Sequence, residues 1–310
     1  MEFIRGFQNI RPEHRGCVAT IGNFDGVHLG HQAVLGQLAE AAGRLSLPTV
    51  VITFEPQPQE YFGGAVDAPR LTRLREKLQA LRRYSVDRVV CLSFNQSLAE
   101  LSAEQFIERL LVDGLGVSYL VVGDDFRFGH QRRGDFDMLK AAGEKHGFQV
   151  VSMHSFLVDG ERVSSTRLRE ALAKGAMDTA GELLGRTYRM SGRVARGDQR
   201  GRQWGFPTAN IHLHRKATPV RGVFAVEMFG VTGEPVAGVA NVGTRPTVDG
   251  TRTLLEVHLF DFVGDIYGRY VEVVFLHKLR DEVRFASLDA LKQQIGLDSD
   301  AARDFFASRK

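Results

Sequence analysis

Cysteine is scarce in this sequence, and long apolar runs are missing from it. Only two of the 310 residues are cysteines, Cys17 and Cys91, and both stand in apolar stretches without a C-x-x-C pair. A disulfide bridge and a metal site are therefore disfavoured, and two buried thiols are expected. No stretch reaches the roughly 20 apolar residues that a membrane helix requires, and the charged amino terminus lacks the apolar core of a signal peptide. These gaps predict a cytoplasmic protein without a membrane partner.

A strong charge of one sign is missing as well. The formal net charge is +3 at pH 7, which is too small to indicate a nucleic-acid partner by itself. From Arg186 onward, basic side chains outnumber acidic ones by five, and polyphosphate would suit that mild excess as well as RNA. Because the sequence has a single tryptophan and scattered arginines, it offers no platform on which nucleic-acid bases would stack. Charge alone leaves the ligand open.

The pattern of the chain changes near residue 185. Before this point, continuous β-branched runs alternate with helix-patterned stretches, which is typical of a parallel sheet covered by helices on both faces. After it, short alternating runs punctuated by Gly, Pro and Asp predict an antiparallel barrel or sandwich. We expect a Rossmann-like α/β domain at 1–185 and a mainly antiparallel β-barrel domain at 186–310, closed by two helices that each begin at a serine. The expected strands of the first domain are 17–22, 49–56, 88–94, 119–126 and 149–156.

The stretch 22–31, GNFDGVHLGH, follows the first of these strands. Open parallel sheets bind ligands at such strand-to-helix turns, where Gly22 and Gly26 let the backbone approach a ligand closely. His28 and His31 share one face of the first helical turn, where free N–H groups and the helix dipole favour an anion. Imidazoles there can stabilise a phosphate as negative charge builds up. Two surface or core histidines are the alternative interpretation of an isolated H-x-x-H.

Two further turns are expected at the same edge of the sheet. VGDDFRFG at 122–129 ends a strand and brings Asp125 and Arg127 there, although a plain strand-end turn has the same pattern. RVSSTRLR at 162–169 opens a helix with hydroxyls and arginines, which suit a triphosphate, although serine and threonine are also the commonest helix caps. Three turns that can each bind an anion, all at one edge of the sheet, favour a phosphate site.

Together these motifs carry a family resemblance. GNFDGVHLGH looks like the H-x-G-H signature of the nucleotidyltransferase superfamily, and SSTRLR looks like its later Ser-Ser-Thr motif. With VGDDFRFG, the first motif resembles the FMN adenylyltransferase domain of the bacterial bifunctional riboflavin kinase/FAD synthetases. The resemblance implies that His28 and His31 stabilise the transition state at the α-phosphate of ATP. The nucleotide-binding residues that it implies are Gly22, Asn23, Phe24, Asp25, Gly26, Asp125, Arg127, Arg162, Ser165, Thr166 and Arg169.

A second candidate site lies in GRVARGDQRGRQWGFPTANI, at 192–211. A Gly-rich loop lets backbone N–H groups reach phosphate, and Thr208 and Asn210 alternate so that their oxygens can face one Mg²⁺. Glu256, on a later strand, alternates onto one face with His258 and Phe260, and a carboxylate beside a phosphate loop can take a proton from an attacking hydroxyl. An ordinary proline turn and a solvated strand glutamate are the alternatives.

The order G-x-x-x-G-R, GFPTAN, NVGTRPT and EVHLFDF resembles riboflavin kinase along the second half of the chain. It implies Mg²⁺ ligands at Thr208 and Asn210, and it implies that Glu256 is the base acting on the ribityl 5′-hydroxyl as this attacks the γ-phosphate of ATP. ATP is then the co-substrate, and flavins (riboflavin, FMN and FAD) are substrates and products. The phosphate- and flavin-binding residues implied here are Gly197, Arg202, Phe206, Asn241, Arg245, Arg280 and Phe285.

Small departures from this family pattern occur at Gln57, where many relatives have His before the proline, and at Phe224, where many have Tyr. Neither removes a proposed catalytic group. We expect a monomeric or weakly oligomeric transferase that phosphorylates riboflavin to FMN and adenylylates FMN to FAD, with small-molecule partners and no nucleic acid. A single-activity adenylyltransferase with a flavin-binding barrel, and an RNA-binding protein on a synthetase-like core, stay open as alternatives.

Overall fold

The computed structural model describes residues 1–63, 68–196, 205–215, 217–247 and 250–309, and it divides into two compact units. The first unit comprises Met1–Ala68 and Arg73–Ser164, and the second comprises Pro69–Thr72 and Ser165–Lys310. The helices between residues 165 and 184 group with the second unit, so the domain boundary at 185/186 stays a prediction.

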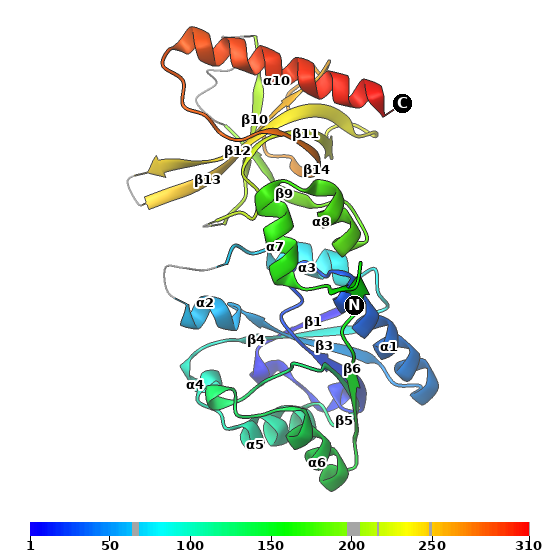
Figure 1. Cartoon of the computed structure of the whole chain (residues 1–310). Helices are drawn as coiled ribbons and strands as arrows, with labels where there is room; N and C mark the ends of the chain where they lie inside the picture. The colour runs from blue at the N-terminus through cyan, green and yellow to red at the C-terminus, as the bar shows by residue number, and fades with distance from the viewer. Residues whose placement is uncertain (64–67, 197–204, 216, 248–249, 310) are drawn as a thin grey trace. The chain divides into compact units, whose positions relative to one another are not determined.

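A six-stranded parallel sheet forms the first unit (Figure 1). Its strands are β1 (Glu2–Arg5), β2 (Cys17–Ile21), β3 (Thr49–Glu55), β4 (Arg88–Ser93), β5 (Val117–Gly123) and β6 (Gln149–Met153), in the order β1-β4-β3-β2-β5-β6. The helices are α1 (Leu29–Leu45), α2 (Pro58–Phe62), α3 (Leu74–Leu81), α4 (Gln96–Ala99), α5 (Ala103–Phe106), the π-helix η3 (Ile107–Gly114) and α6 (Phe136–His146). Short 3₁₀ turns are η1 (Phe7–Asn9), η2 (Pro12–His14) and η4 (His130–Arg132), and β7 (Leu157–Val158) pairs with β8 (Glu161–Arg162). The expected Rossmann-like α/β fold is confirmed, with β1 as an additional strand.

The central strands are buried on both faces because alternate side chains enter two different cores. Val18 and Val51 join the core under α1 and α3, whereas Ala19 and Ile52 join the core under α5, η3 and α6. Figure 1 shows α1 on one side of the sheet and α5 and α6 on the other. Since the strand interiors are apolar on both faces, polar side chains gather at the strand ends.

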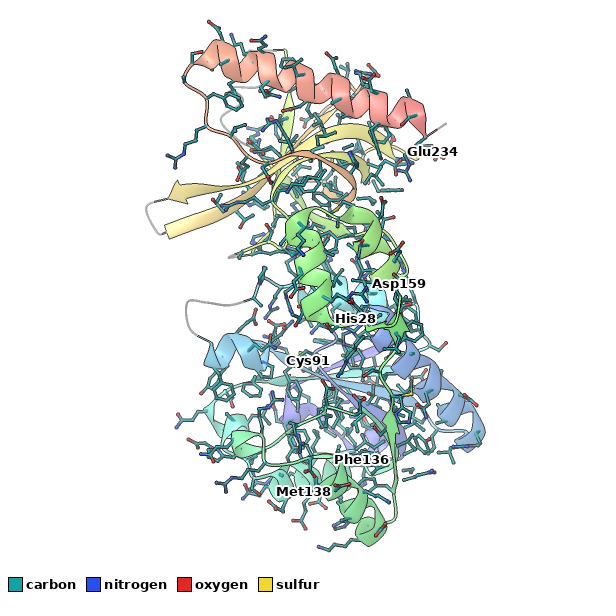
Figure 2. All side chains as sticks on the ribbon, in the orientation of Figure 1. His28, Cys91, Phe136, Met138, Asp159 and Glu234 are labelled. Carbon is teal, nitrogen blue, oxygen red and sulfur yellow. The ribbon has the colours of Figure 1, made fainter. Side chains whose placement is uncertain are left out.

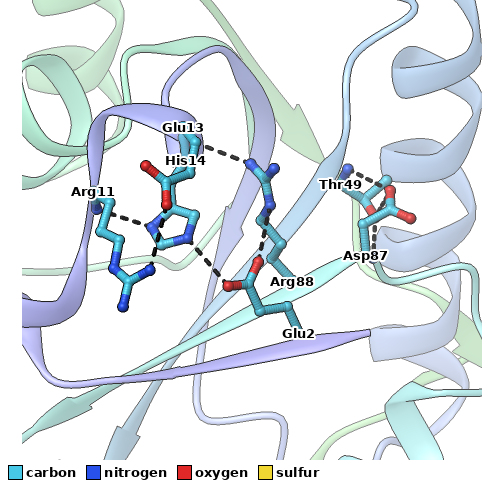
Figure 3. A network of polar contacts seen from close by, with 7 residues as sticks. All are labelled: Glu2, Arg11, Glu13, His14, Thr49, Asp87 and Arg88. Carbon is cyan, nitrogen blue, oxygen red and sulfur yellow. Dashed lines mark hydrogen bonds and ion pairs between the residues drawn. The ribbon is translucent and has the colours of Figure 1, made fainter.

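Polar contacts fasten the amino ends of the strands (Figure 3). Glu2 of β1 contacts His14 Nε2 at 3.2 Å and Arg88 Nε at 3.5 Å. Thr49, which begins β3, donates its N–H to Asp87 Oδ2 at 2.9 Å, and Asp87 donates its N–H to Thr49 Oγ1 at 2.8 Å. β1 was not expected because its EFIR sequence lacks an apolar run, and it is held instead by this network and by parallel pairing with β4.

Two helices, a closed antiparallel barrel and a long helix form the second unit (Figure 1). The elements are α7 (Ser165–Lys174), α8 (Met177–Leu184), β9 (Arg189–Ala195), β10 (Thr208–His212), β11 (Gly222–Phe229), β12 (Val236–Thr247), β13 (Gly250–Leu259), β14 (Tyr270–Arg280) and α10 (Leu288–Ser308). The barrel closes in the order β10-β13-β12-β11-β14-β9. Phe224 is fully buried, whereas its neighbours Val223 and Ala225 pack with Ala302 of α10. The expected antiparallel barrel is confirmed.

One helix, not two, follows the barrel. α10 runs unbroken from Leu288 to Ser308, so the expectation of two serine-capped helices is wrong. Ser287 is the cap, accepting a hydrogen bond from Ala290 N at 3.2 Å, whereas the Ser299 hydroxyl donates to Ile295 O at 2.8 Å inside the helix. A serine can satisfy its hydroxyl in either way, so the residue type alone does not mark a helix start.

Both cysteines are free and buried, as expected. Cys17 has no exposed surface in β2, and its burial raises the pKa of the thiol to about 12. In the part of the chain that the structure describes, no helix combines the length and the apolar character needed to cross a membrane.

Candidate active sites

The GNFDG turn leaves β2 in an unusual backbone conformation. Gly22 N donates to Ile52 O at 3.0 Å, which keeps the turn at the carboxyl end of β2 and β3. Phe24 and Val27 then adopt φ angles of 47° and 46°, in the left-handed region that residues with side chains rarely occupy. Both are buried, so packing holds a conformation that costs on the order of 1–3 kcal/mol per residue. Strain of this kind concentrates at functional sites.

His28 and His31 are brought together at the start of α1, as the sequence predicts. His28 is the N-cap of the helix, and its Nδ1 accepts a hydrogen bond from His31 N at 3.4 Å. The two rings stack with centroids 3.7 Å apart and planes inclined by 22°. Figure 2 shows His28 where α1 begins. The same view shows Phe136 and Met138 on α6, which covers a face of the same sheet. The imidazoles therefore stand where the N-terminus of α1 attracts anions.

The environment of His31 keeps its imidazole neutral. Burial, together with the neighbouring His28 and Lys77, holds the pKa of His31 well below its usual value near 6.5. The residue as a whole is partly exposed, but its Nδ1 is shielded and has no hydrogen-bond partner among the described residues. A buried polar atom without a partner is costly in a native structure unless a ligand satisfies it.

Gly30, between the two histidines, is a site residue that the sequence reasoning missed. A Cβ atom at this position would lie 3.2 Å from both Cε1 and Nδ1 of His28 and 3.4 Å from Val163 O. Gly30 therefore lets the backbone of the 162–164 segment and the His28 ring lie close to the first turn of α1. The glycine itself could have indicated this position, because glycine is unfavourable in a helix and its presence there suggests a steric constraint.

Gln57 lies just after β3 and is 3% exposed. Its N–H donates to Glu60 Oε2 at 2.8 Å, which begins α2, whereas its side-chain Nε2 has no partner among the described residues. This amide is a second shielded donor at the carboxyl edge of the sheet.

The turn after β5 brings Asp125 to Arg162, with Oδ2 and Nη2 2.8 Å apart. Two of the predicted residues, Asp125 in the turn and Arg162 in β8, are therefore in contact. Arg127 instead pairs with Asp135 at 2.8 Å. A hydrogen bond from Met138 N, assisted by Arg127, holds the pKa of Asp135 below its usual range. Arg127 thus fastens the start of α6, and its guanidinium is exposed at the strand end.

Ser165, Thr166 and Arg169 lie in the first turns of α7, in the second unit. Thr166 is exposed, and Ser165 is partly exposed. Arg169 Nε donates to Pro69 O at 2.9 Å, which ties the segment 69–72 to α7 within that unit.

The second site is built by strand register. Glu256 of β13 is paired with Asn210 of β10 on one side and with Asn241 of β12 on the other, and Thr208 is paired with His258. Because Ala209, Val257 and Val242 fill the barrel interior, Glu256 and the two asparagines share its outer face. Side chains directly opposite on neighbouring strands lie about 5 Å apart at Cβ, so the predicted carboxylate and oxygen donors form one cluster.

His258 closes one end of this cluster. Its Nδ1 lies 2.9 Å from Pro207 O, and its ring meets Phe206 and Phe260 edge to face with centroids 5.5 and 5.9 Å away. His258 thereby fixes the residues that lead into Thr208. No role was predicted for this histidine, because its partner lies 51 residues away in the chain.

Arg280 is engaged with α10 rather than free. Its Nε and Nη2 donate to both carboxylate oxygens of Asp298, at 2.7 and 2.6 Å, and its guanidinium lies 5.8 Å from the ring centre of Phe285. This bidentate pair orients the segment after β14. Gly197 and Arg202 lie outside the described residues, as does the side chain of Arg245.

The fold and these two clusters define a two-site, phosphate-handling transferase, with a nucleotidyltransferase-like parallel sheet followed by a closed barrel. The family model described as FAD synthetase matches residues 10–167, and the model described as riboflavin kinase matches residues 184–306. The chain belongs to the family of bifunctional riboflavin kinase/FMN adenylyltransferases, as the resemblance predicts.

Relatives of that name match along nearly the whole chain. The bifunctional riboflavin kinase/FMN adenylyltransferase of Pseudomonas fluorescens is 53% identical, over 98% of this chain and 97% of its own. That of Escherichia coli K12 is 51% identical, over 100% and 99%. A crystal structure from Streptococcus pneumoniae, described as a macrolide-efflux protein, is 31% identical with a TM-score of 0.83, covering 98% of this chain and 99% of that one.

Proposed function

We propose that this chain makes FMN from riboflavin at the barrel site and FAD from FMN at the sheet site, using one ATP in each reaction. The observation that carries the proposal most directly is the stacked His28–His31 pair at the N-terminus of α1, in which the shielded His31 Nδ1 has no hydrogen-bond partner among the described residues. Its counterpart in the barrel is the Glu256 carboxylate between two asparagines.

Adenylyl transfer needs no general base. The phosphate of FMN, with a second pKa near 6, is already largely dianionic at neutral pH. One of its oxygens attacks the α-phosphorus of ATP, and the bond to the bridging oxygen breaks as pyrophosphate leaves. His28 and His31 donate N–H bonds to the oxygens on which negative charge accumulates. His31 is neutral because its pKa is lowered, so it offers one N–H donor and one lone pair.

Other predicted residues hold the triphosphate and the nucleoside. Gly22, Asn23, Phe24, Asp25 and Gly26 form the turn that lies under the ATP. Arg162, already oriented by Asp125, supplies positive charge. The further contacts to ATP that we propose come from Asp125, Arg127, Ser165, Thr166 and Arg169.

Riboflavin phosphorylation does need a base, because a hydroxyl is the nucleophile. Glu256 takes the proton of the ribityl 5′-hydroxyl, whose oxygen attacks the γ-phosphorus while ADP leaves. Asn210 and Asn241 flank this carboxylate by register. The phosphate and flavin contacts that we propose are Gly197, Arg202, Phe206, Asn241, Arg245, Arg280 and Phe285.

Thr208 and Asn210 fit a Mg²⁺ ion. They supply a hydroxyl and an amide oxygen on the outer face that Glu256 shares, and Mg²⁺ prefers such hard donors and keeps several of its waters. When bound, the ion neutralises charge on the transferred phosphoryl group. The small-molecule partners are riboflavin, FMN and ATP, without nucleic acid, and the protein works in the cytoplasm as a monomer or weak oligomer.

A time course with riboflavin and MgATP, followed by chromatography of the products, tests the proposal. FMN is expected first and FAD after it. If FAD forms only when FMN is supplied, the protein is a single-activity adenylyltransferase. If neither product forms, the proposal is wrong. The absorbance of the purified protein is a second check, since bound flavin is yellow whereas bound RNA adds absorbance at 260 nm.

A further inference from the structure

Lys77 is a buried ammonium near the first site that the mechanism above does not use. It lies in α3, where Leu74, Leu78 and Leu81 recur at helical spacing, and it takes a place on that apolar stripe. Only 1% of its surface is exposed. Burying an ammonium is unfavourable unless hydrogen bonds and charges satisfy it, so its contacts indicate its role.

A chain of hydrogen bonds runs from Lys77 to the GNFDG turn. Lys77 Nζ donates to Thr53 Oγ1 at 3.2 Å, and Thr53 Oγ1 donates to Asn23 O at 3.4 Å. A hydroxyl has one proton and two lone pairs, so both bonds can exist together. Thr53 is itself fully buried in β3. The three residues therefore connect α3, through β3, to the turn that precedes His28.

This connection meets the turn where its backbone is most constrained. Asn23 directly precedes Phe24, the first of the two residues in the left-handed region. Such conformations persist only when the surroundings over-determine them. The bond from Thr53 fixes the carbonyl of the Asn23–Phe24 peptide, and Lys77 fixes the hydroxyl of Thr53.

We propose that Lys77 is a positioning residue for adenylyl transfer, which holds the turn 22–26 through Thr53 and sets a positive charge near His31. The inference rests on the proposed function of the first site. Besides burial, His28 and Lys77 are the titratable groups that lower the pKa of His31. The carboxylate nearest to His31 in the sequence is that of Asp25. With Lys77 charged, His31 stays neutral while the incoming phosphates bring the negative charge.

Lys77→Met tests this inference, because it keeps the length of the side chain and removes the charge and the donor. The kcat of FAD formation from FMN is expected to fall by about 10- to 100-fold, the loss typical of residues that orient the ligands of a metal site. The pKa of His31, measured by NMR titration, is expected to rise but to stay below 6.5, because burial persists. Lys140→Met, on the exposed surface of α6, is the matched control and should change neither quantity.

Thr53 provides a second pair of variants in case Lys77→Met fails to fold. Thr53→Val removes the hydroxyl at nearly constant volume and should lower FAD formation, whereas Thr53→Ser keeps the hydroxyl and should stay within about twofold of the unmodified protein. Unchanged FAD formation in both Lys77→Met and Thr53→Val would overturn the inference. An unmoved His31 titration would also overturn it. That titration needs no turnover, so it separates a failure of this inference from a failure of the proposed activity.

Discussion

The two sites are built in opposite ways. The sheet site depends on a strained turn and a helix start, with Phe24 and Val27 held at positive φ and two imidazoles stacked at the end of α1. The barrel site depends on unstrained strand register, with Glu256 between Asn210 and Asn241. The first site can therefore be disturbed by small changes of shape, whereas the second can be disturbed mainly by changing the reacting group itself.

The difference follows from the two reactions. FMN brings its own charged nucleophile to the sheet site, so that site must shape and stabilise rather than deprotonate. Riboflavin brings a neutral hydroxyl to the barrel site, so a carboxylate must be placed beside it. A turn at a helix N-terminus directs its N–H groups and the imidazole rings toward one bound phosphate. A strand face instead places alternate side chains at regular spacing along one line.

Glu256→Gln should have the largest effect, because it removes the proposed base and keeps its shape. FMN formation is expected to fall by about 10²- to 10⁴-fold, while FAD formation from supplied FMN stays unchanged. Separate assays of the two half-reactions measure this. Glu227→Gln on β11 is the matched control, and survival of FMN formation in Glu256→Gln would show that another group is the base.

His28→Ala should give the reciprocal result with a somewhat smaller loss. Removing one donor to the developing charge is expected to lower FAD formation by about 10²- to 10³-fold and to leave FMN formation intact. His146→Ala, at the exposed end of α6, controls for the loss of a histidine in the same unit. Equal loss of both activities in a folded variant would contradict two separate sites.

Gly30→Ala should have the smallest effect of the three, and it tests shape alone. The added Cβ would press on the His28 ring at 3.2 Å, so a loss of about tenfold in FAD formation is expected from a shift of the imidazole. Gly36→Ala in the same helix has open space around its Cβ and should instead stabilise the protein by up to about 1 kcal/mol. Thermal unfolding and the FAD assay distinguish the two variants.

Much of this arrangement could be predicted from local pattern. The alternation of apolar runs gave the sheet, and the spacing of His28 and His31 placed both rings at one helix start. The period of two along β10 and β13 placed Asn210 and Glu256 on the outer face.

The rest depends on contacts that no local pattern contains. The burial of Lys77 could not be predicted, because a lysine in a sequence is normally expected at the surface. Its link to Asn23, through Thr53, joins residues 54 positions apart in the chain. Likewise the ion pair between Arg280 and Asp298 joins the end of β14 to a helix whose length was misjudged.

Cys17 gives the parallel sheet a built-in reporter. With a thiol pKa near 12, on the order of one molecule in 10⁴ carries a thiolate at pH 8, and the sulfur has no path to solvent. An alkylating reagent can therefore label this position only in molecules whose sheet has opened. The rate of labelling at Cys17 would read out how often the central strands separate, without any residue being introduced into the chain.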